Sequence, residues 1–248
     1  MPKVGKHTPY FELLDAQSQA GCPICRLVDK ATERYLDSIL YEAVLDPTVR
    51  AKLKAARGFC ARHVEMLRHM PGRALGIALI YRDIIRAVAM ALDGKQIAPI
   101  APSPLERLLQ RLCGTRAAQP VIASQICPAC TIGQTAERDY LSLLLAHLDD
   151  PALQAAYAAG DGLCLEHLAQ ALQIVDDEAA LRRLAQPQLA RYKTMLRDLD
   201  EFIRKRDHRF SHEKYGEEGD VWLRAMNAIV GGAGRGLFTR GHIIHCAS

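Results

Sequence analysis

Aromatic residues are scarce in this sequence: they make up 6% of the chain and include a single tryptophan. Strands draw heavily on aromatic and β-branched residues, whereas alanine and leucine, which dominate here, favour helices. The composition therefore counts against a sheet protein and predicts an all-α fold. At 248 residues, the chain is long enough for one large core or two ordinary domains.

The sequence has no large excess of positive or negative charge: the formal net charge is +4, and 24% of the residues are charged. Proteins that bind nucleic acids usually concentrate basic residues on one face. The composition thus gives no reason to expect a nucleic-acid partner. A protein partner or a small ligand stays open, and the sequence identifies neither.

Long uncharged hydrophobic runs are also missing. The N-terminal residues Met1–Lys6 are charged, and no apolar stretch of signal-peptide length follows, so export by that route is not expected. The most apolar run, Leu75–Leu92, contains Arg82, Asp83 and Arg86 near its middle, where charge in hydrocarbon is costly. We expect a buried helix there rather than a membrane span, in a protein of the reducing cytoplasm.

Cysteine is present eight times, and six of these residues belong to a motif that occurs twice. Each copy begins with Cys-Pro-x-Cys and closes with Cys-x-x-His. Thiolate and imidazole are ligands that zinc prefers, and in a reducing compartment such units are more typical of metal thiolates than of disulfides. Cys113 and Cys246 stand outside the pattern. The predicted metal ligands are Cys22, Cys25, Cys60 and His63 in the first copy, and Cys127, Cys130, Cys164 and His167 in the second.

The two copies match beyond their ligands. Six residues of the first copy recur 105 positions later: Cys22, Pro23, Cys25, Ala31, Tyr35 and Leu36. The Asp-Pro pair and the glycine before each Cys-x-x-His recur 104 positions later. Such agreement predicts a duplicated helical unit. The expected ranges are 1–98 for the first metal-binding repeat, 99–206 for the second, and 207–248 for a polar segment, a short helix and a Gly-rich tail.

Local signals place the ligands on helix starts. A stripe of apolar residues at spacings of three and four follows Cys25, and Asp46-Pro47 is typical of the cap and first position of another helix. Cys60 and His63 are three apart at the start of a further helix, so both point to the same side. We expect each Cys-Pro-x-Cys knuckle to close onto the Cys-x-x-His of its own copy.

Two zinc ions in closed, structural sites are the expected cofactors, because four protein ligands leave no position for water or substrate. An iron–sulfur cluster is the alternative occupant. A thiol oxidoreductase is the main enzymatic alternative, since Cys-x-x-Cys pairs can cycle as dithiols. Covalent haem is excluded, because Arg26 and Thr131 stand where a histidine would follow the motif.

A second candidate site lies late in the chain. Helix is expected from about Asp177, interrupted near Pro187 and then resumed; a polar segment and a short helix from Trp222 follow. Mixed charges of this kind usually form a solvated surface loop, but acids and imidazoles could also share a face there. The residues of this possible ligand site are Asp207, His208, Arg209, His212 and Glu217.

The Cys-Pro-x-Cys start, the Gly-Phe-Cys-x-x-His close and the late segment Phe202–Phe210 resemble an uncharacterised bacterial family of unknown function. This chain has His208 where the family pattern has tyrosine. The resemblance supports the fold and implies no activity. The sequence thus favours a metal-binding, non-enzymatic binding or regulatory module; the alternative is a thiol- or metal-dependent enzyme, redox or iron–sulfur, with its site near residues 207–224.

Overall fold

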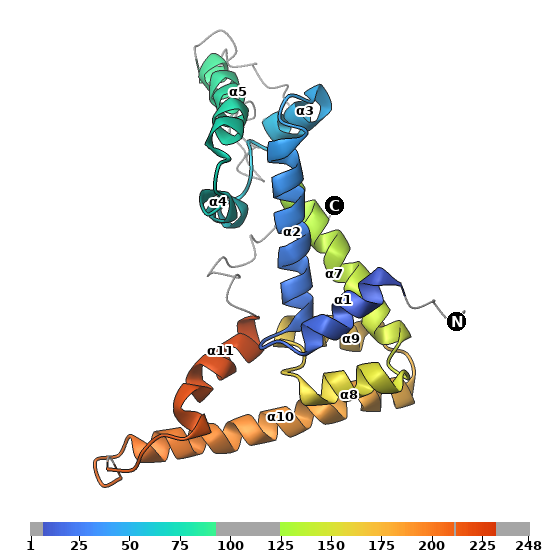
Figure 1. Ribbon diagram of the computed structural model, residues 1–248, viewed down its shortest axis with the longest axis vertical. Coiled ribbons are helices and arrows are strands. Elements are labelled where there is room, and N and C mark those ends of the chain that lie inside the picture. Colours follow the sequence, from blue (N-terminus) through green and yellow to red (C-terminus); the bar gives the residue numbers. More distant parts are fainter. Residues whose placement is uncertain (1–6, 93–124, 211, 232–248) are drawn as a thin grey trace, which may run out of the picture. The chain divides into compact units, whose positions relative to one another are not determined.

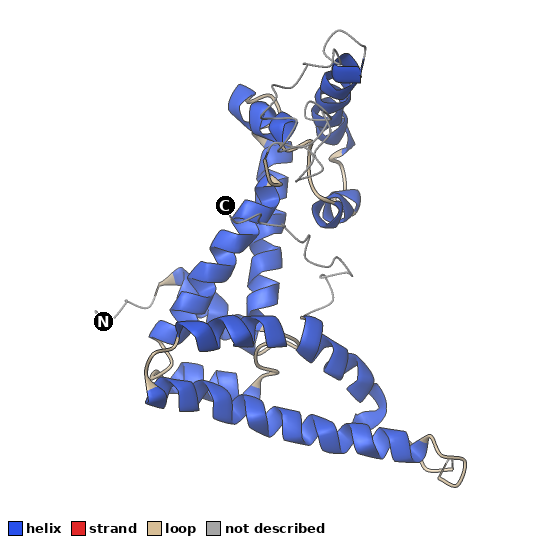
Figure 2. Ribbon diagram, turned by 180° about the vertical axis from the view of Figure 1, so that it is seen from behind, coloured by secondary structure: helices blue, strands red, loops and turns tan. Residues whose placement is uncertain are grey.

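The computed structural model describes residues 7–92, 125–210 and 212–231 of the chain. Every regular element in these ranges is a helix, as Figure 2 shows, so the predicted all-α class is confirmed. The chain divides into two compact units: unit 1 comprises residues 1–31 and 133–248, and unit 2 comprises residues 32–132. These units do not coincide with the domain ranges predicted from the sequence, which are 1–98, 99–206 and 207–248. Those ranges remain a prediction about the two sequence repeats.

Two long helices each belong to both units. Helix α2 (Pro23–Tyr41) begins in unit 1 and ends in unit 2, whereas α7 (Pro128–Ala146) begins in unit 2 and ends in unit 1. A helix of 19 residues is about 28 Å long. The beginning and the end of each long helix are therefore far apart.

Unit 1 contains most of the remaining helices, and α8 runs along α10 in Figure 1. Leu13 of α1, Leu141 of α7 and Leu184 of α10 are fully buried in its apolar core, together with the cysteines of the first knuckle. The helices are α1 (Thr8–Gln17), α8 (Pro151–Ala159), α9 (Leu165–Ile174), α10 (Glu178–Lys205), the 3-10 helix η1 (Glu217–Asp220) and α11 (Val221–Val230).

Unit 2 packs α3 (Pro47–Ala55), α4 (Ala61–Arg68) and α5 (Ala74–Leu92) with the end of α2 and the start of α7. Its core includes Leu36, Leu53 and Ile80. Arg50 of α3 forms an ion pair with Asp83 of α5 and holds these two helices together. The cap predicted at Asp46 is confirmed, because its carboxylate accepts hydrogen bonds from the amides of Thr48 and Val49.

Two expectations about individual helices need correction. Helix α10 is not interrupted at Pro187: buried Leu184 and Gln188 on either side anchor it, and the Tyr157 hydroxyl donates to the Leu184 carbonyl at 3.2 Å. Helix α5 is buried on one face only, because Ile80 is 3% exposed while Leu75 is 73% exposed. Among the described helices, none combines the length and the apolar character needed to span a bilayer. The capping-box sequence Ser103-Pro104-Leu105-Glu106 predicts a further helix to Cys113, but these positions lie outside the described residues.

Candidate metal centres

The eight predicted ligands form two groups of four. Within each group, the sulfur and Nδ1 atoms available for coordination all lie within 4.8 Å of one another. Centre 1 consists of Cys22, Cys25, Cys164 and His167, and centre 2 consists of Cys60, His63, Cys127 and Cys130. Each centre therefore lies within one unit: centre 1 in unit 1 and centre 2 in unit 2.

The pairing of the motifs differs from the sequence-based expectation. Each knuckle meets the Cys-x-x-His of the other copy, so the expected closure of Cys22 and Cys25 onto Cys60 and His63, and of Cys127 and Cys130 onto Cys164 and His167, is wrong. The reason is the length of α2 and α7, whose 19 residues carry the chain about 28 Å from each knuckle. The nine-residue helices α3 and α8 that follow are too short to bring the chain back to the knuckle of its own copy.

Each knuckle is a tight turn at the start of a long helix. Helix α2 begins at Pro23, and the Arg26 amide donates to the Cys22 carbonyl at 3.2 Å. In the second copy, the Cys130 amide donates to the Cys127 carbonyl at 2.9 Å. The turn brings both sulfurs of a knuckle to one end of the helix, where the free amides favour thiolate.

The Cys-x-x-His units begin the short helices α4 and α9. Cys60 and Cys164 are the N-cap residues, so the histidine three positions later lies on the same side of the first turn. A glycine with positive φ precedes each unit: Gly58 at 92° and Gly162 at 75°. A Cβ at Gly162 would also collide with the Gln188 side chain. The repeated glycines are thus needed for the backbone conformation that precedes Cys60 and Cys164.

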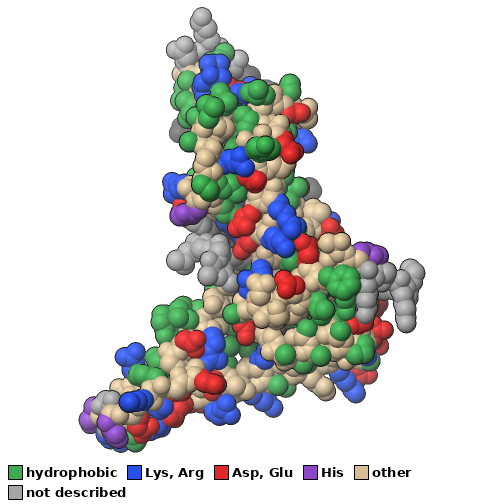
Figure 3. All heavy atoms as spheres, in the orientation of Figure 1, with side chains coloured by type: hydrophobic (Ala, Val, Ile, Leu, Met, Phe, Trp, Pro, Cys, Tyr) green, Lys and Arg blue, Asp and Glu red, His purple; other side chains and the backbone are tan. Residues whose placement is uncertain are grey.

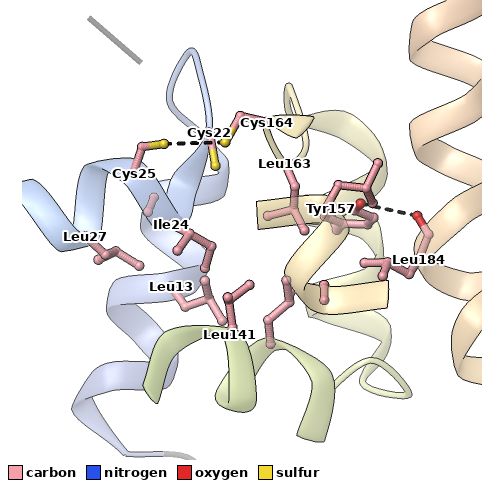
Figure 4. Close-up of a cluster of buried hydrophobic side chains, with 14 of the residues drawn as sticks. Leu13, Cys22, Ile24, Cys25, Leu27, Leu141, Tyr157, Leu163, Cys164 and Leu184 are labelled. Atoms are coloured by element: carbon pink, nitrogen blue, oxygen red, sulfur yellow. Dashed lines mark hydrogen bonds between the residues drawn. The ribbon is translucent and has the colours of Figure 1, made fainter. Parts of the chain in front are cut away.

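The distances in centre 1 fit a single tetrahedral ion. The Cys25 and Cys164 sulfurs are 3.7 Å apart, and Nδ1 of His167 lies 3.4, 3.4 and 3.2 Å from the sulfurs of Cys22, Cys25 and Cys164. A zinc ion about 2.3 Å from sulfur and 2.0 Å from nitrogen places sulfurs about 3.8 Å apart and sulfur and nitrogen about 3.5 Å apart. Figure 4 shows these sulfurs beside Ile24 and Leu163, at the edge of the apolar core.

Centre 2 has the same dimensions. The Cys60 and Cys130 sulfurs are 3.6 Å apart. Nδ1 of His63 lies 3.1 Å from the Cys60 sulfur and 3.5 Å from the sulfurs of Cys127 and Cys130. The two centres therefore offer the same ligand set at the same spacing.

Burial distinguishes the centres. All four ligands of centre 1 are buried, and Cys25 and Cys164 are only 2% and 1% exposed. In centre 2, His63 and Cys127 are buried, but Cys60 and Cys130 are partly exposed. Two ligand residues of centre 2 are therefore less buried than their counterparts in centre 1.

Glu137 of α7 supports centre 1 from outside the ligand set. Its Oε1 lies 2.7 Å from Nε2 of His167, the ring nitrogen opposite the ligand atom. A carboxylate in this position orients the imidazole and makes it a stronger ligand. The corresponding position of the first copy is Thr32, which is 1% exposed and carries no charge.

The electrostatics favour thiolate at Cys164 in centre 1 and at Cys60 in centre 2, whereas hydrogen bonds with Cys127 and Cys60 raise the pKa of Cys130. Hydrogen bonds from the Cys22 and Cys25 thiols lower the pKa of Cys164 far below its ordinary value, against the effect of burial. In the same way, the thiols of Cys127 and Cys130 lower the pKa of Cys60.

The histidine pKa values shift in the opposite direction. Burial alone would lower them, but hydrogen bonds to the surrounding sulfurs prevail and raise the pKa of His63 to about 9. The pKa of His167 rises to about 11, because its protonated ring donates to the sulfurs of Cys164 and Cys22 and also to Glu137. An incoming metal ion must therefore displace a proton from each imidazole.

The late candidate residues do not converge in the same way. Asp207 pairs with Arg209 at 2.7 Å and with His208 at 3.1 Å, and the His208 side chain is 90% exposed. His212 is also exposed. Hydrogen bonds that Arg209 donates lower the pKa of Asp207. These residues form a surface loop.

Glu217 lines a hollow of about 440 Å³ together with Gly216, Asp220 and Arg224. Arg224 already donates to Asp220 at 2.9 Å and to the Glu217 carbonyl at 2.7 Å. The hollow shares only Glu217 with the ligand site expected from the sequence.

Glu137 is not among the residues that the sequence predicts for the site. The available signal is its position seven residues after Cys130, two helical turns along the face that follows the knuckle. A glutamate on a helix is usually solvated, so this spacing alone does not mark it. The pairing of the motifs across copies is what brings it to His167.

Comparison with known proteins places this chain among others whose function is unknown. A family described as "Family of unknown function (DUF6062)" matches residues 9–235. The "Uncharacterized 23.9 kDa protein in xynA 3'region" of Caldicellulosiruptor sp. (strain Rt8B.4) is 26% identical over 212 residues, which cover 85% of this chain and 95% of that protein. No solved structure matches significantly. The family match includes all eight ligands of the two centres.

Proposed function

This chain belongs to the DUF6062 family of unknown function, and we propose that it is a helical binding or regulatory module in which each centre holds one structural zinc ion. The observation that carries the proposal is the agreement of both sets of ligand distances with the edges of a zinc tetrahedron. Three cysteines and one histidine are a common ligand set of closed zinc sites.

The compactness of the centres favours a single ion over an iron–sulfur cluster. Four ligand atoms within 4.8 Å of one another leave room for one ion about 2.3 Å from each sulfur. A cluster needs additional space for at least two irons and their bridging sulfides. Zinc therefore fits these centres better than the alternative cofactor.

Completion of the tetrahedron by protein atoms supports a structural role. No coordination position is left for water or substrate once four protein ligands are bound. Each ion would join the start of a long helix to the start of a short one, within a single unit: α2 to α9 in unit 1, and α7 to α4 in unit 2. Folding of each unit is then coupled to metal binding.

The proposed setting is the cytoplasm, where a reducing environment keeps the six ligand cysteines as thiolates. The proposed partner is a protein or a small ligand. Basic and acidic side chains are interspersed on the face of the chain seen in Figure 3, which gives no support to a nucleic-acid partner.

Elemental analysis of the purified full-length protein tests the proposal. We expect two zinc ions per chain, one for each group of ligands. Cys60→Ala and Cys164→Ala should each remove one ion. A protein that contains no metal, or one that contains iron and absorbs visible light, would contradict the proposal.

The alternative function is a thiol- or metal-dependent enzyme with its site near residues 207–224. The hollow beside Glu217 and Arg224 is the observation that favours it. Glu217→Ala should then abolish binding of a small molecule identified by ligand screening while leaving the zinc content unchanged. If screening finds no ligand that Glu217→Ala affects, this alternative fails.

A further inference from the structure

We propose that centre 2 is an oxidation site, at which a hydroperoxide converts Cys60 and Cys130 to a disulfide and releases the metal ion, while centre 1 keeps its own ion. This inference rests on the proposed function, because it takes both centres to bind zinc. It assigns different roles to two centres that have the same ligands.

The two centres contain equivalent cysteine pairs that differ in exposure. Cys60 and Cys130 are the Cys-x-x-His cysteine and the second knuckle cysteine of centre 2, and their sulfurs are 3.6 Å apart. Cys25 and Cys164 are their counterparts in centre 1, at 3.7 Å. The first pair is partly exposed, whereas the second is buried. Access of the oxidant, rather than spacing, therefore separates the pairs.

The geometry allows a direct bond. A disulfide needs its sulfurs about 2.05 Å apart, so the Cys60 and Cys130 sulfurs must approach by less than about 2 Å. This bond would remove two of the four ligands and leave only Cys127 and His63 for the metal. It would also connect the starts of α4 and α7, which the ion had joined before.

The reaction balances with the hydroperoxide as the only oxidant. One thiolate attacks the peroxide, a sulfur–oxygen bond forms, the oxygen–oxygen bond breaks, and the departing oxygen takes a proton from solvent. The second thiolate attacks the resulting sulfenic acid, forms the disulfide and expels hydroxide, which is protonated to water. The two sulfurs lose two electrons and the peroxide gains them. Zinc leaves as the divalent ion, with its charge unchanged.

The surroundings of the histidines point in the same direction. The carboxylate of Glu137 supports His167 of centre 1 at 2.7 Å, while the uncharged Thr32 occupies the corresponding position in the first copy. A carboxylate partner strengthens an imidazole ligand. Centre 1 thus has a carboxylate support for its histidine, and its cysteines are the more buried.

The test uses the full chain with Cys113→Ser and Cys246→Ser, so that only the six ligand cysteines remain. The zinc-loaded protein is titrated with hydrogen peroxide, released zinc is measured with a chromogenic chelator, and disulfides are mapped by mass spectrometry. We expect half of the zinc to leave together with formation of a Cys60–Cys130 disulfide, at doses about tenfold below those that affect the other half. A thiol reductant with added zinc should restore the full metal content.

Centre 1 serves as the matched control within the same molecule. Loss of both ions at the same dose, or a first disulfide between Cys25 and Cys164, would overturn this inference while leaving the zinc-binding function intact. A chain that contains no zinc before oxidation would refute the proposed function and this inference together.

Discussion

Glu137 is the side chain whose contribution to zinc binding can be tested most selectively, because it touches a ligand without being one. Its carboxylate lies 2.7 Å from Nε2 of His167. Loss of such a partner lowers metal affinity about 10–100-fold. Glu137→Gln and Glu137→Ala should therefore weaken zinc binding at centre 1 and leave centre 2 unchanged.

Chelator competition on the zinc-loaded protein measures this effect. Asp149→Asn, which removes an exposed carboxylate from the same unit, is the matched control and should have no effect. An unchanged affinity in Glu137→Ala would show that the carboxylate does not support the centre.

The raised pKa of His63 predicts how zinc binding at centre 2 depends on pH. Below a pKa of about 9, the imidazole holds a proton that zinc must displace. The apparent affinity should thus rise with pH below that value, about tenfold per unit for each proton displaced. Zinc titrations between pH 6 and 9 measure the slope, and an affinity independent of pH would contradict the assignment of His63.

The sequence predicts which residues gather locally but not how the local groups combine. Cys22 with Cys25, and Cys60 with His63, are three residues apart, so a single turn brings each pair together. Which Cys-x-x-Cys pair meets which Cys-x-x-His pair depends on where the long helices α2 and α7 end. The spacing of the ligands in the sequence does not reveal this. Glu137 could not be identified for the same reason.

At the scale of elements, the two aspartate caps allow a matched comparison. Asp46 and Asp150 cap α3 and α8 in the same way, and removal of such a cap costs about 1 kcal/mol. Asp150 also accepts a hydrogen bond from the buried Tyr10 hydroxyl at 2.7 Å, which ties α1 to α8. Asp150→Ala should therefore destabilise the protein more than Asp46→Ala.

Denaturant unfolding of the zinc-loaded protein measures the difference. In the Tyr10→Phe background, which lacks the hydroxyl, the cost of Asp150→Ala should fall toward that of Asp46→Ala. Equal costs in the wild-type background would show that the Tyr10 contact contributes nothing.

Gln188 connects α10 to the backbone just before Cys164. Its Oε1 accepts from the Leu163 amide at 3.2 Å, and its Nε2 donates to the Leu163 carbonyl at 2.9 Å. Gln188→Leu would leave these buried groups without their partner, at a cost of about 1–3 kcal/mol each. We expect lower stability and weaker zinc binding at centre 1, although no ligand is changed.

Exposed Gln186 on the same helix provides the control. Gln186→Leu should leave both the unfolding midpoint and the zinc affinity unchanged. If Gln188→Leu behaves like Gln186→Leu, α10 does not position Cys164.

At the scale of the whole molecule, the two motif copies depend on each other. Each centre takes its knuckle from one copy and its Cys-x-x-His from the other, so neither copy contains a complete centre. The all-α class followed from composition and helical spacing, because these properties are local. The interleaving of the units did not, because it depends on α2 and α7 each passing from one unit to the other.

Zinc content of two double variants tests this cross-copy pairing most directly. Cys22→Ala with Cys164→Ala removes two ligands from centre 1 alone, so elemental analysis should find one remaining zinc ion per chain. Cys22→Ala with Cys60→Ala damages both centres and should leave no tightly bound zinc. The reverse result, with one ion kept by the second variant and none by the first, would contradict the cross-copy pairing.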